Sequence, residues 1–306
     1  MSGPLHADPH WPRAHRWLAG EHAPEAARRL AVLGAPSRRG SITPGRCDLA
    51  PAAIRRALER YSTYDIASGR DLSHVAAHDH GDLPIAPQSP AESFEVLRQS
   101  IGRVIPTADA LVLLGGDNSI TRAGVHGLRA PLNECGLLTL DAHLDLRDLD
   151  AGLTNGNPVR ALLADGLPGE NIVQIGIQSF ANSADYARVA REAGIRVVTA
   201  EEAHRRGLAS VTAEQLELLA SRVKAIYVDC DLDVLDRSFS PATPGSRPGG
   251  FAPWELREAV RAAGECPYVK ILDLVEMDPE RDVADATALA AAACLLEFAT
   301  GVAGRV

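Results

Sequence analysis

Cysteine is scarce in this sequence, and the cysteines present show no pairing. The 306 residues include five cysteines, at positions 47, 135, 230, 266 and 294, and none belongs to a C-x-x-C motif. A disulfide scaffold or a zinc knuckle needs closely spaced pairs. This odd and scattered set therefore argues against both kinds of protein and favours a reducing cytoplasm.

Long apolar runs and an excess of basic residues are also missing. No segment reaches the roughly 20 apolar residues of a membrane span, and the polar start MSGPLHADPHWPRAHRW lacks the apolar core of a signal peptide. We therefore expect no membrane partner and interpret residues 289–303 as a buried closing helix. With 31 basic against 40 acidic residues, the net charge of −9 argues against a nucleic-acid partner, which needs a basic surface.

The sequence does contain a regular alternation of apolar runs and helical patterns. Runs of strand length occupy residues 29–35, 109–117, 136–143, 171–177, 195–200, 224–233 and 268–277. Helical patterns occupy residues 51–61, 89–105, 157–166, 183–194, 212–223 and 252–264. Their start signals include Ser183, Thr212 and Pro253, and their C-terminal cap signals are Gly194 and Gly264. Such alternation is typical of an α/β fold with a parallel sheet covered on both faces.

We predict one domain for most of the chain. It spans residues 26–306, because no linker or internal repeat interrupts the alternation. Residues 1–25, rich in His, Pro and Trp, are predicted to form an irregular N-terminal arm.

Polar residues directly follow three of the predicted strands. They form GGDNSI at 115–120, DAHLDLRD at 141–148 and DCDLDVLD at 229–236. The carboxyl ends of parallel strands meet at one sheet edge, where functional residues collect. A buried carboxylate loses several kcal/mol of hydration unless a positive charge compensates, and the two acidic clusters contain no basic residue before Arg147 and Arg237. The sequence therefore predicts a bound cation at this edge.

Side-chain alternation supports a shared metal site. Because successive strand residues point to opposite sides, two sets can each face one side: Asp141, His143 and Asp145, and Asp229, Asp231 and Asp233. Carboxylate oxygens with one imidazole suit Mn²⁺ or a related hard divalent ion, and two such clusters can bridge two ions. The alternative is that these aspartates form turns and cap helices, which are common roles for single Asp residues.

The same stretches resemble the signature motifs of the ureohydrolase family, which comprises arginases, agmatinases and formimidoylglutamases. The resemblance rests on GGDNS, DAHLD and DCDLDVLD followed by SPATPGSRPGG, and it extends over most of the chain. It implies a three-layer αβα arginase-type fold with a mostly parallel central sheet. It also implies a binuclear Mn²⁺ centre and a homotrimer or homohexamer that acts on a small-molecule substrate.

The resemblance also implies roles for individual residues. The implied metal ligands are Asn118, Asp141, His143, Asp145, Asp231 and Asp233. Among these, Asp141 and Asp231 would bridge two ions. Asn118 and Asp145 would complete the ligand shell of one ion. His143 and Asp233 would complete the ligand shell of the other. The implied catalytic residues are Asp145, which passes a proton to the leaving nitrogen, and Glu276 in VEMDP. Glu276 would hold the amidine or guanidine nitrogen of the substrate by a charge-assisted hydrogen bond.

Two departures from the family pattern indicate a subfamily. Most members have GGDHS where this chain has Asn118, and arginases have a His where this chain has Asn155 in TNGNP. Both departures resemble formimidoylglutamases of histidine degradation. The implied reaction is hydrolysis of N-formimidoyl-L-glutamate to L-glutamate and formamide, by attack of a metal-bridging hydroxide on the amidine carbon. Asn118 has an alternative role, which is to stabilise the turn before a helix.

A substrate with two carboxylates needs cationic partners in the pocket. Arg147 and Arg160 are the candidates, because a planar guanidinium binds a carboxylate through two hydrogen bonds. Asn155 and Glu276 complete the predicted substrate-binding set, and Gln178 stands where many such relatives have Arg. Two alternatives remain. One is an agmatinase or other guanidino-acid hydrolase that releases urea, and the other is a catalytically idle, oligomeric relative.

Overall fold

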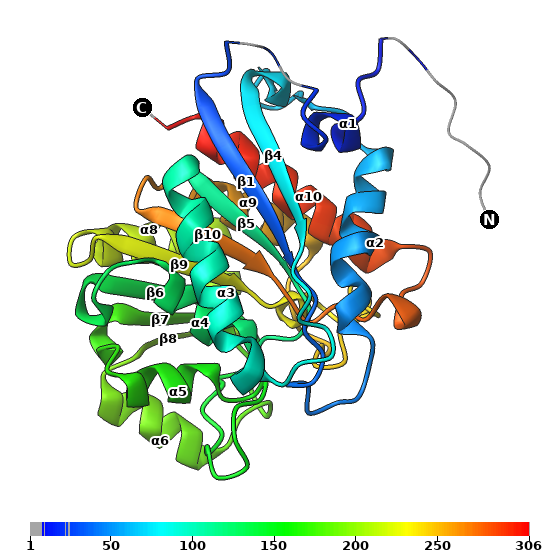
Figure 1. The fold of residues 1–306 in the computed structure, drawn as a ribbon. Helices are drawn as coiled ribbons and strands as arrows, with labels where there is room; N and C mark the ends of the chain where they lie inside the picture. The colour runs from blue at the N-terminus through cyan, green and yellow to red at the C-terminus, as the bar shows by residue number, and fades with distance from the viewer. Residues whose placement is uncertain (1–7, 9, 22, 24, 306) are drawn as a thin grey trace.

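The computed structural model describes residues 8, 10–21, 23 and 25–305 and is centred on an eight-stranded sheet (Figure 1). Every neighbouring pair in this sheet is parallel, and the strand order is β4-β1-β5-β10-β9-β6-β7-β8. The strands are β1 (Arg28–Ala35), β4 (Val75–Asp82), β5 (Ala110–Gly115), β6 (Cys135–Leu140), β7 (Ile172–Ile177), β8 (Arg196–Thr199), β9 (Ala225–Cys230) and β10 (Val269–Leu274). A separate antiparallel pair joins β2 (Tyr64–Asp65) to β3 (Arg70–Asp71).

The seven predicted strands are confirmed, and the eighth was missed. Strands β5, β6, β7 and β9 are buried along their whole length, which explains their continuous apolar runs. Edge strand β4 instead carries the polar sequence HDHGD, and its C-terminal half is largely exposed. This half of β4 buries little side-chain surface, so it lacks the continuous apolar run of the central strands.

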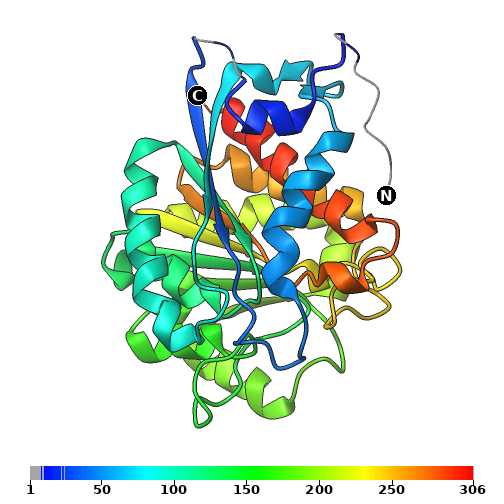
Figure 2. The same ribbon diagram turned by 45° about the vertical axis from the view of Figure 1, so that its right-hand side comes forward.

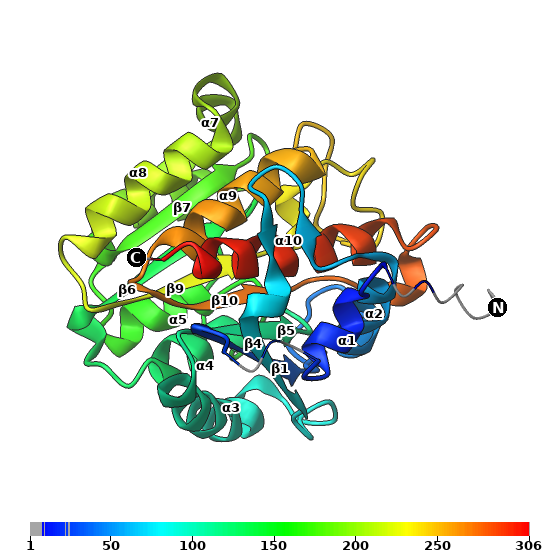
Figure 3. The ribbon, with the colours of Figure 1, turned by 90° about the horizontal axis from the view of Figure 1, so that it is seen from above.

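Helices cover both faces of the sheet, which gives three layers (Figure 3). One layer contains α2 (Ala50–Ala57), α7 (Ala200–Arg206), α8 (Leu208–Ala220), α9 (Pro253–Glu265) and α10 (Ala286–Ala303). The other contains α3 (Pro90–Val104), α4 (Ile120–Gly127), α5 (Pro158–Asp165) and α6 (Ala184–Ala193). Each layer shares one hydrophobic core with one face of the sheet. The predicted αβα architecture is therefore confirmed.

Three of the five helix-end signals are confirmed and two are wrong. Pro253 begins α9 as predicted. The Ser183 hydroxyl accepts a hydrogen bond from the Tyr186 amide at the start of α6, and Gly194 ends that helix at φ +81°. Helix α8, however, begins at Leu208, so Thr212 lies inside it. Gly264 also lies inside its helix, because α9 continues to Glu265. An added Cβ at Gly264 would come within 2.3 Å of the Phe298 carbonyl oxygen on α10. Its sequence signal reflects close helix packing and not a cap.

Part of the predicted irregular arm is helical. Helix α1 (Ala14–Leu18) buries Trp17, whose indole Nε1 donates a hydrogen bond to the Val75 carbonyl oxygen over 2.9 Å. Figure 2 shows α1 beside the start of β4, where Val75 lies. The apolar indole needs cover from water, so this stretch packs onto the domain although its sequence has little helical periodicity.

Helix α10 is long and apolar enough to cross a membrane by length and composition alone. Within the structure, however, 78% of that window is buried, between α9 and α2 (Figure 3). Its apolar surface is therefore explained by core packing, as expected for a closing helix.

Candidate metal centre

The three polar segments and the VEMDP segment meet at one edge of the sheet because the strands before them are neighbours. The order β5-β10-β9-β6 places the ends of these four strands side by side. Asn118 follows β5, Glu276 follows β10, Asp231 follows β9 and Asp141 follows β6. Residues separated by more than a hundred positions thus reach one site through parallel pairing.

An imidazole and two carboxylates form the tightest group at this edge. Nδ1 of His143 lies 2.8 Å from Oδ2 of Asp233 and 3.5 Å from Oδ1 of Asp141. The ligand atoms of these three residues all lie within 4.8 Å of one another. Asp141 Oδ2 is buried without a hydrogen-bond partner. A buried oxygen without a partner is costly, and a divalent ion would satisfy it, so this donor set fits a hard cation.

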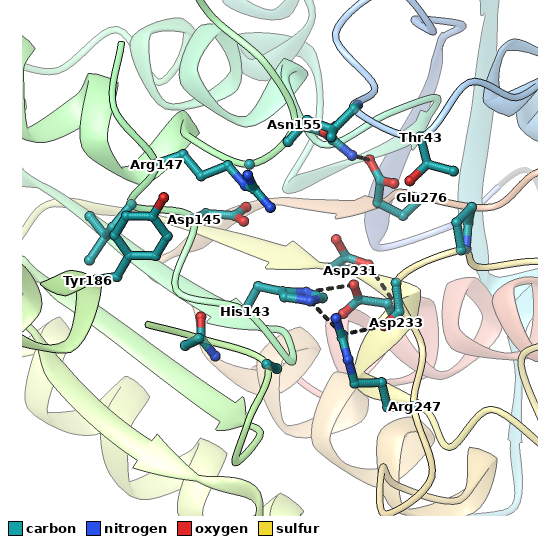
Figure 4. Close-up of a pocket in the computed structure, with 17 residues that line it drawn as sticks. Thr43, His143, Asp145, Arg147, Asn155, Tyr186, Asp231, Asp233, Arg247 and Glu276 are labelled. Carbon is teal, nitrogen blue, oxygen red and sulfur yellow. Dashed lines mark hydrogen bonds and ion pairs between the residues drawn. The ribbon is translucent and has the colours of Figure 1, made fainter. Parts of the chain in front are cut away.

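The other predicted ligands surround this group. Asp145 and Asp231 line the same pocket as His143 and Asp233 (Figure 4). The amide Nδ2 of Asn118 donates to Asp145 Oδ2 over 2.7 Å, and its Oδ1 accepts from the Thr121 hydroxyl over 2.6 Å. In this arrangement the Asn118 oxygen faces away from Asp145. Binding an ion through that oxygen would require the amide to turn over, which leaves the ligand role of Asn118 a prediction.

Burial and mutual repulsion make the carboxylates reluctant to ionise together. Burial, followed by the charge of Asp233, raises the pKa of Asp141 to about 7. Burial likewise raises the pKa values of Asp145 and Asp231 well above the usual range, and neighbouring carboxylates add to both shifts. Burial acts in the same direction on Asp233, but the adjacent His143 lowers its pKa overall. Such excess negative charge is what a bound cation would neutralise.

Glu276 is a buried residue that forms the floor of the same pocket. Its Oε1 accepts hydrogen bonds from the Asn118 backbone N–H over 2.6 Å and from Asn155 Nδ2 over 3.0 Å. Asn155 is held in turn by its Oδ1, which accepts from the Ile42 backbone N–H over 2.9 Å. Despite these donors, burial and the charge of Asp117 raise the pKa of Glu276 to about 8. The structure therefore joins Asn155 and Glu276 into one unit.

A pocket of about 200 Å³ opens above these groups. Arg147 lines it, as the sequence predicted for a substrate-binding cation, and its side chain packs over Gly156. Four further lining residues with polar side chains received no role from the sequence: Thr43, Asn182, Tyr186 and Arg247. Arg247 lies within the motif SPATPGSRPGG, so the motif was a signal, but nothing local showed where its side chain would point.

The structure does not bring Arg160 into the pocket. It is absent from the lining, and its guanidinium Nε is buried without a hydrogen-bond partner. Only its main chain approaches the site, because the Arg160 N–H donates to the Asp145 carbonyl oxygen in the first turn of α5. The substrate-binding role of Arg160 therefore stays a prediction, without support from the pocket lining. Gln178 is also absent from the lining.

Comparison with known proteins agrees with this geometry. The sequence model of the arginase family matches residues 28–301. The chain belongs to the arginase family. The predicted ureohydrolase resemblance and arginase-type fold are therefore confirmed.

Individual relatives narrow the comparison within the arginase family. A formimidoylglutamase of Halalkalibacterium halodurans is 34% identical over 276 residues, which cover 89% of this chain and 86% of that protein. The crystal structure of formimidoylglutamase from Bacillus subtilis strain 168 matches with a TM-score of 0.90 at 29% identity, covering 100% of this chain and 96% of that one. Trypanosoma cruzi formiminoglutamase with Mn²⁺ has the same fold, with a TM-score of 0.86 at 24% identity over 97% and 100% of the two chains.

Proposed function

We propose that this member of the arginase family is a manganese-dependent formimidoylglutamase. It hydrolyses a C–N bond of N-formimidoyl-L-glutamate and releases L-glutamate and formamide. The similarity to the Halalkalibacterium halodurans formimidoylglutamase, at 34% identity over 89% of this chain, supports this assignment.

The observation that carries the proposal is the polarity of the pocket. Its floor holds the Glu276 carboxylate, which suits the cationic amidine end of the substrate, and its mouth holds Arg147, which suits a carboxylate. The agmatine alternative carries a cationic tail, which this guanidinium would repel. An anionic tail is therefore the better match.

The metal set follows the sequence prediction. The residues that would hold Mn²⁺ are Asn118, Asp141, His143, Asp145, Asp231 and Asp233. The unpartnered oxygen of Asp141 and the cluster around His143 support this proposal, as does the Mn²⁺ in Trypanosoma cruzi formiminoglutamase. Bound Mn²⁺ supplies an activated water at neutral pH.

The side chains of this chain then perform the remaining steps. Glu276 accepts a hydrogen bond from the amidine N–H, and Asn155 holds that carboxylate in place. Arg147 binds a substrate carboxylate and so fixes the amidine carbon over the floor. When water has added to that carbon, its bond to the amino-acid nitrogen breaks. Asp145 delivers a proton to this leaving nitrogen, which departs as the amine of glutamate.

The cellular setting is part of the same proposal. We propose a cytoplasmic homotrimer or homohexamer, as the family resemblance implies. The scattered and unpaired cysteines suit a reducing compartment.

A product assay tests the function. Purified protein with Mn²⁺ is given N-formimidoyl-L-glutamate, agmatine and guanidino acids in turn, and formamide and urea are measured. We expect formamide from the first substrate and little urea from the others. Urea as the only product would refute the assignment in favour of a guanidino hydrolase. No retained Mn²⁺ and no rate on Mn²⁺ addition would indicate a catalytically idle relative.

A further inference from the structure

A second arginine faces the pocket from a different element than Arg147. Arg147 lies on the segment after β6, whereas Arg247 lies on the loop between β9 and α9, and both line the same cavity. Figure 4 shows them on two sides of the pocket, with His143 and Asp231 between them. A ligand in the pocket therefore meets a guanidinium on either side.

Neither of these guanidinium groups has a carboxylate partner. Among the described residues, no Asp or Glu oxygen lies within 4.0 Å of Arg147 or Arg247, although Arg55, Arg122 and Arg261 are each paired with acids. Two uncompensated guanidinium groups beside one small pocket form a site for a dianion, because each presents a fork that matches one carboxylate.

The loop that carries Arg247 is firmly built. Buried hydroxyls of Ser240, Thr243 and Ser246 bond to one another directly before it, with Ser240 Oγ 2.7 Å from Thr243 Oγ1. Arg237 ties the same loop together, because its Nη1 donates to the Thr243 carbonyl oxygen and its backbone N–H donates to the Arg247 carbonyl oxygen. The backbone at Arg247 is thus held, while its side chain remains largely exposed to the pocket.

The present contact of Arg247 is with a predicted metal ligand. Its Nη1 lies 2.7 Å from His143 Nε2 and also donates to the Gly245 carbonyl oxygen over 2.7 Å. The guanidinium therefore occupies the Nε2 side of the His143 ring. Nδ1 is the atom that faces Asp233 at 2.8 Å. A divalent cation held by His143 would place a second positive charge beside this guanidinium, and the repulsion favours movement of Arg247 away from the ring.

We propose that Arg247 is a second substrate-carboxylate residue, which rests on His143 in the metal-free protein and binds one substrate carboxylate when the metal is present. This inference rests on the proposed function, since a formimidoylglutamate has two carboxylates, one for each arginine. Arg247 would supply a cation that the sequence lacks at Gln178. It would also link metal binding to substrate binding, because the cation at His143 releases the guanidinium.

The kinetic test uses Arg247→Gln and Arg247→Lys with N-formimidoyl-L-glutamate and two analogues. N-formimidoyl-L-2-aminobutyrate lacks the side-chain carboxylate, and 4-(formimidoylamino)butyrate lacks the α-carboxylate. For Arg247→Gln we expect KM to rise at least about tenfold with the full substrate while kcat changes little. Against one of the analogues the rise should disappear, and Arg247→Lys should fall between the two proteins. An unchanged KM, or an equal rise with the full substrate and both analogues, would overturn the proposal.

Mn²⁺ binding provides a readout independent of turnover. Titration followed by electron paramagnetic resonance should show tighter Mn²⁺ binding to Arg247→Gln than to wild type, by about threefold or more, because the competing cation is gone. Arg191→Gln, on the exposed side of α6, is the control and should match wild type. Weaker or equal Mn²⁺ binding by Arg247→Gln would overturn the proposed competition. If wild type turned over no formimidoylglutamate, the proposed function would fail, whereas the Mn²⁺ titration would still decide the Arg247–His143 contact.

Discussion

At the scale of single residues, the site stands out by its backbone as well as by its charge. Asp145 and Glu276 are non-glycine residues with positive φ, at +52° and +68°. Such conformations cost free energy and persist where the surroundings enforce them. In Glu276 the enforced turn aims the carboxylate at the Asn118 N–H and at Asn155. The strained backbone of Glu276 therefore serves to orient its carboxylate.

Replacement of Glu276 by Gln should abolish most of the activity. The amide keeps the shape but loses the negative charge that faces the amidine, so kcat for formamide release should fall about a hundredfold or more. Mn²⁺ content should stay unchanged, because Glu276 is outside the proposed ligand set. Glu280→Gln, on the exposed turn nearby, serves as the control and should keep full activity. Full activity of Glu276→Gln would remove this residue from the mechanism.

Gly245 allows the close approach of its loop to a metal ligand. A Cβ added there would lie 2.1 Å from Asp233 Oδ2, which is closer than any contact that atoms tolerate. Gly245→Ala should therefore displace the Asp233 carboxylate and weaken Mn²⁺ binding about tenfold or more, measured by metal titration. Pro248→Ala in the same exposed part of the loop should leave Mn²⁺ binding as in wild type. Equal affinities for both variants would show that Asp233 is not a ligand.

At the scale of secondary-structure elements, a buried arginine joins the ends of several segments. The guanidinium of Arg305, just after α10, donates to the carbonyl oxygens of Gly264, Val269 and Asp109. These belong to α9, to β10 and to the residue before β5. The residue is only 9% exposed, and burial lowers its pKa to about 10. One side chain thus fixes the C-terminus against both a helix and the sheet.

Arg305→Met should destabilise the protein strongly without touching the site. Three buried carbonyls would lose their charged donor, at a cost of about 3 kcal/mol in the free energy of unfolding. For a chain of this size we expect Tm to fall by roughly 4–5 °C in a calorimetric scan. Arg191→Met, at an exposed position of α6, should change Tm little. If the Tm of Arg305→Met changed as little as that of Arg191→Met, water would have replaced the lost hydrogen bonds.

At the scale of the whole molecule, the fold gathers more negative charge than it can hold alone. Parallel pairing brings carboxylates from the ends of β6, β9 and β10 into one site. The metal-free protein responds by holding protons, as the raised pKa values of Asp141, near 7, and Glu276, near 8, indicate. A cation bound at this site would therefore stabilise the fold as well as take part in the proposed chemistry.

The stability of the metal-free protein should fall as the pH rises. Burial raises these two pKa values above those of the unfolded chain, which lie near 4. Between about pH 4 and 8 the folded state holds more protons than the unfolded state, so stability is highest at the acidic end of this window. It is lost as pH rises through about 7 and 8.

Thermal unfolding with and without Mn²⁺ checks this prediction. In chelator, Tm should decrease from pH 5.5 to 8.5 by roughly 5 °C or more, whereas saturating Mn²⁺ should reverse most of the loss at pH 8.5. A metal-free Tm that stays level or rises over this range would contradict the charge excess.

Most of the fold could be read from local pattern, and the misses have physical causes. Six strands appeared as apolar runs because helices cover both of their faces, and the edge strand β8 appeared through its two valines. Strand β4 escaped because its C-terminal half is polar and largely exposed. The signal of Thr212 failed because Gly207 and Leu208 start α8 one turn earlier. Gly264 resembled a helix cap because glycine is common at helix ends. In this structure, close packing of α9 on α10 explains the glycine.

The sequence by itself determined the kind of chemistry. Asp141, His143, Asp231 and Asp233 follow buried strands directly, and the cost of burying carboxylates there predicts a compensating cation. Only the tertiary structure decided which distant groups complete the site. It brought Arg247 and not Arg160 into the pocket, and joined Asn155 to Glu276. The reason is that strand-end chemistry is set within a few residues, whereas the direction of a long side chain on a loop depends on packing against segments a hundred residues away.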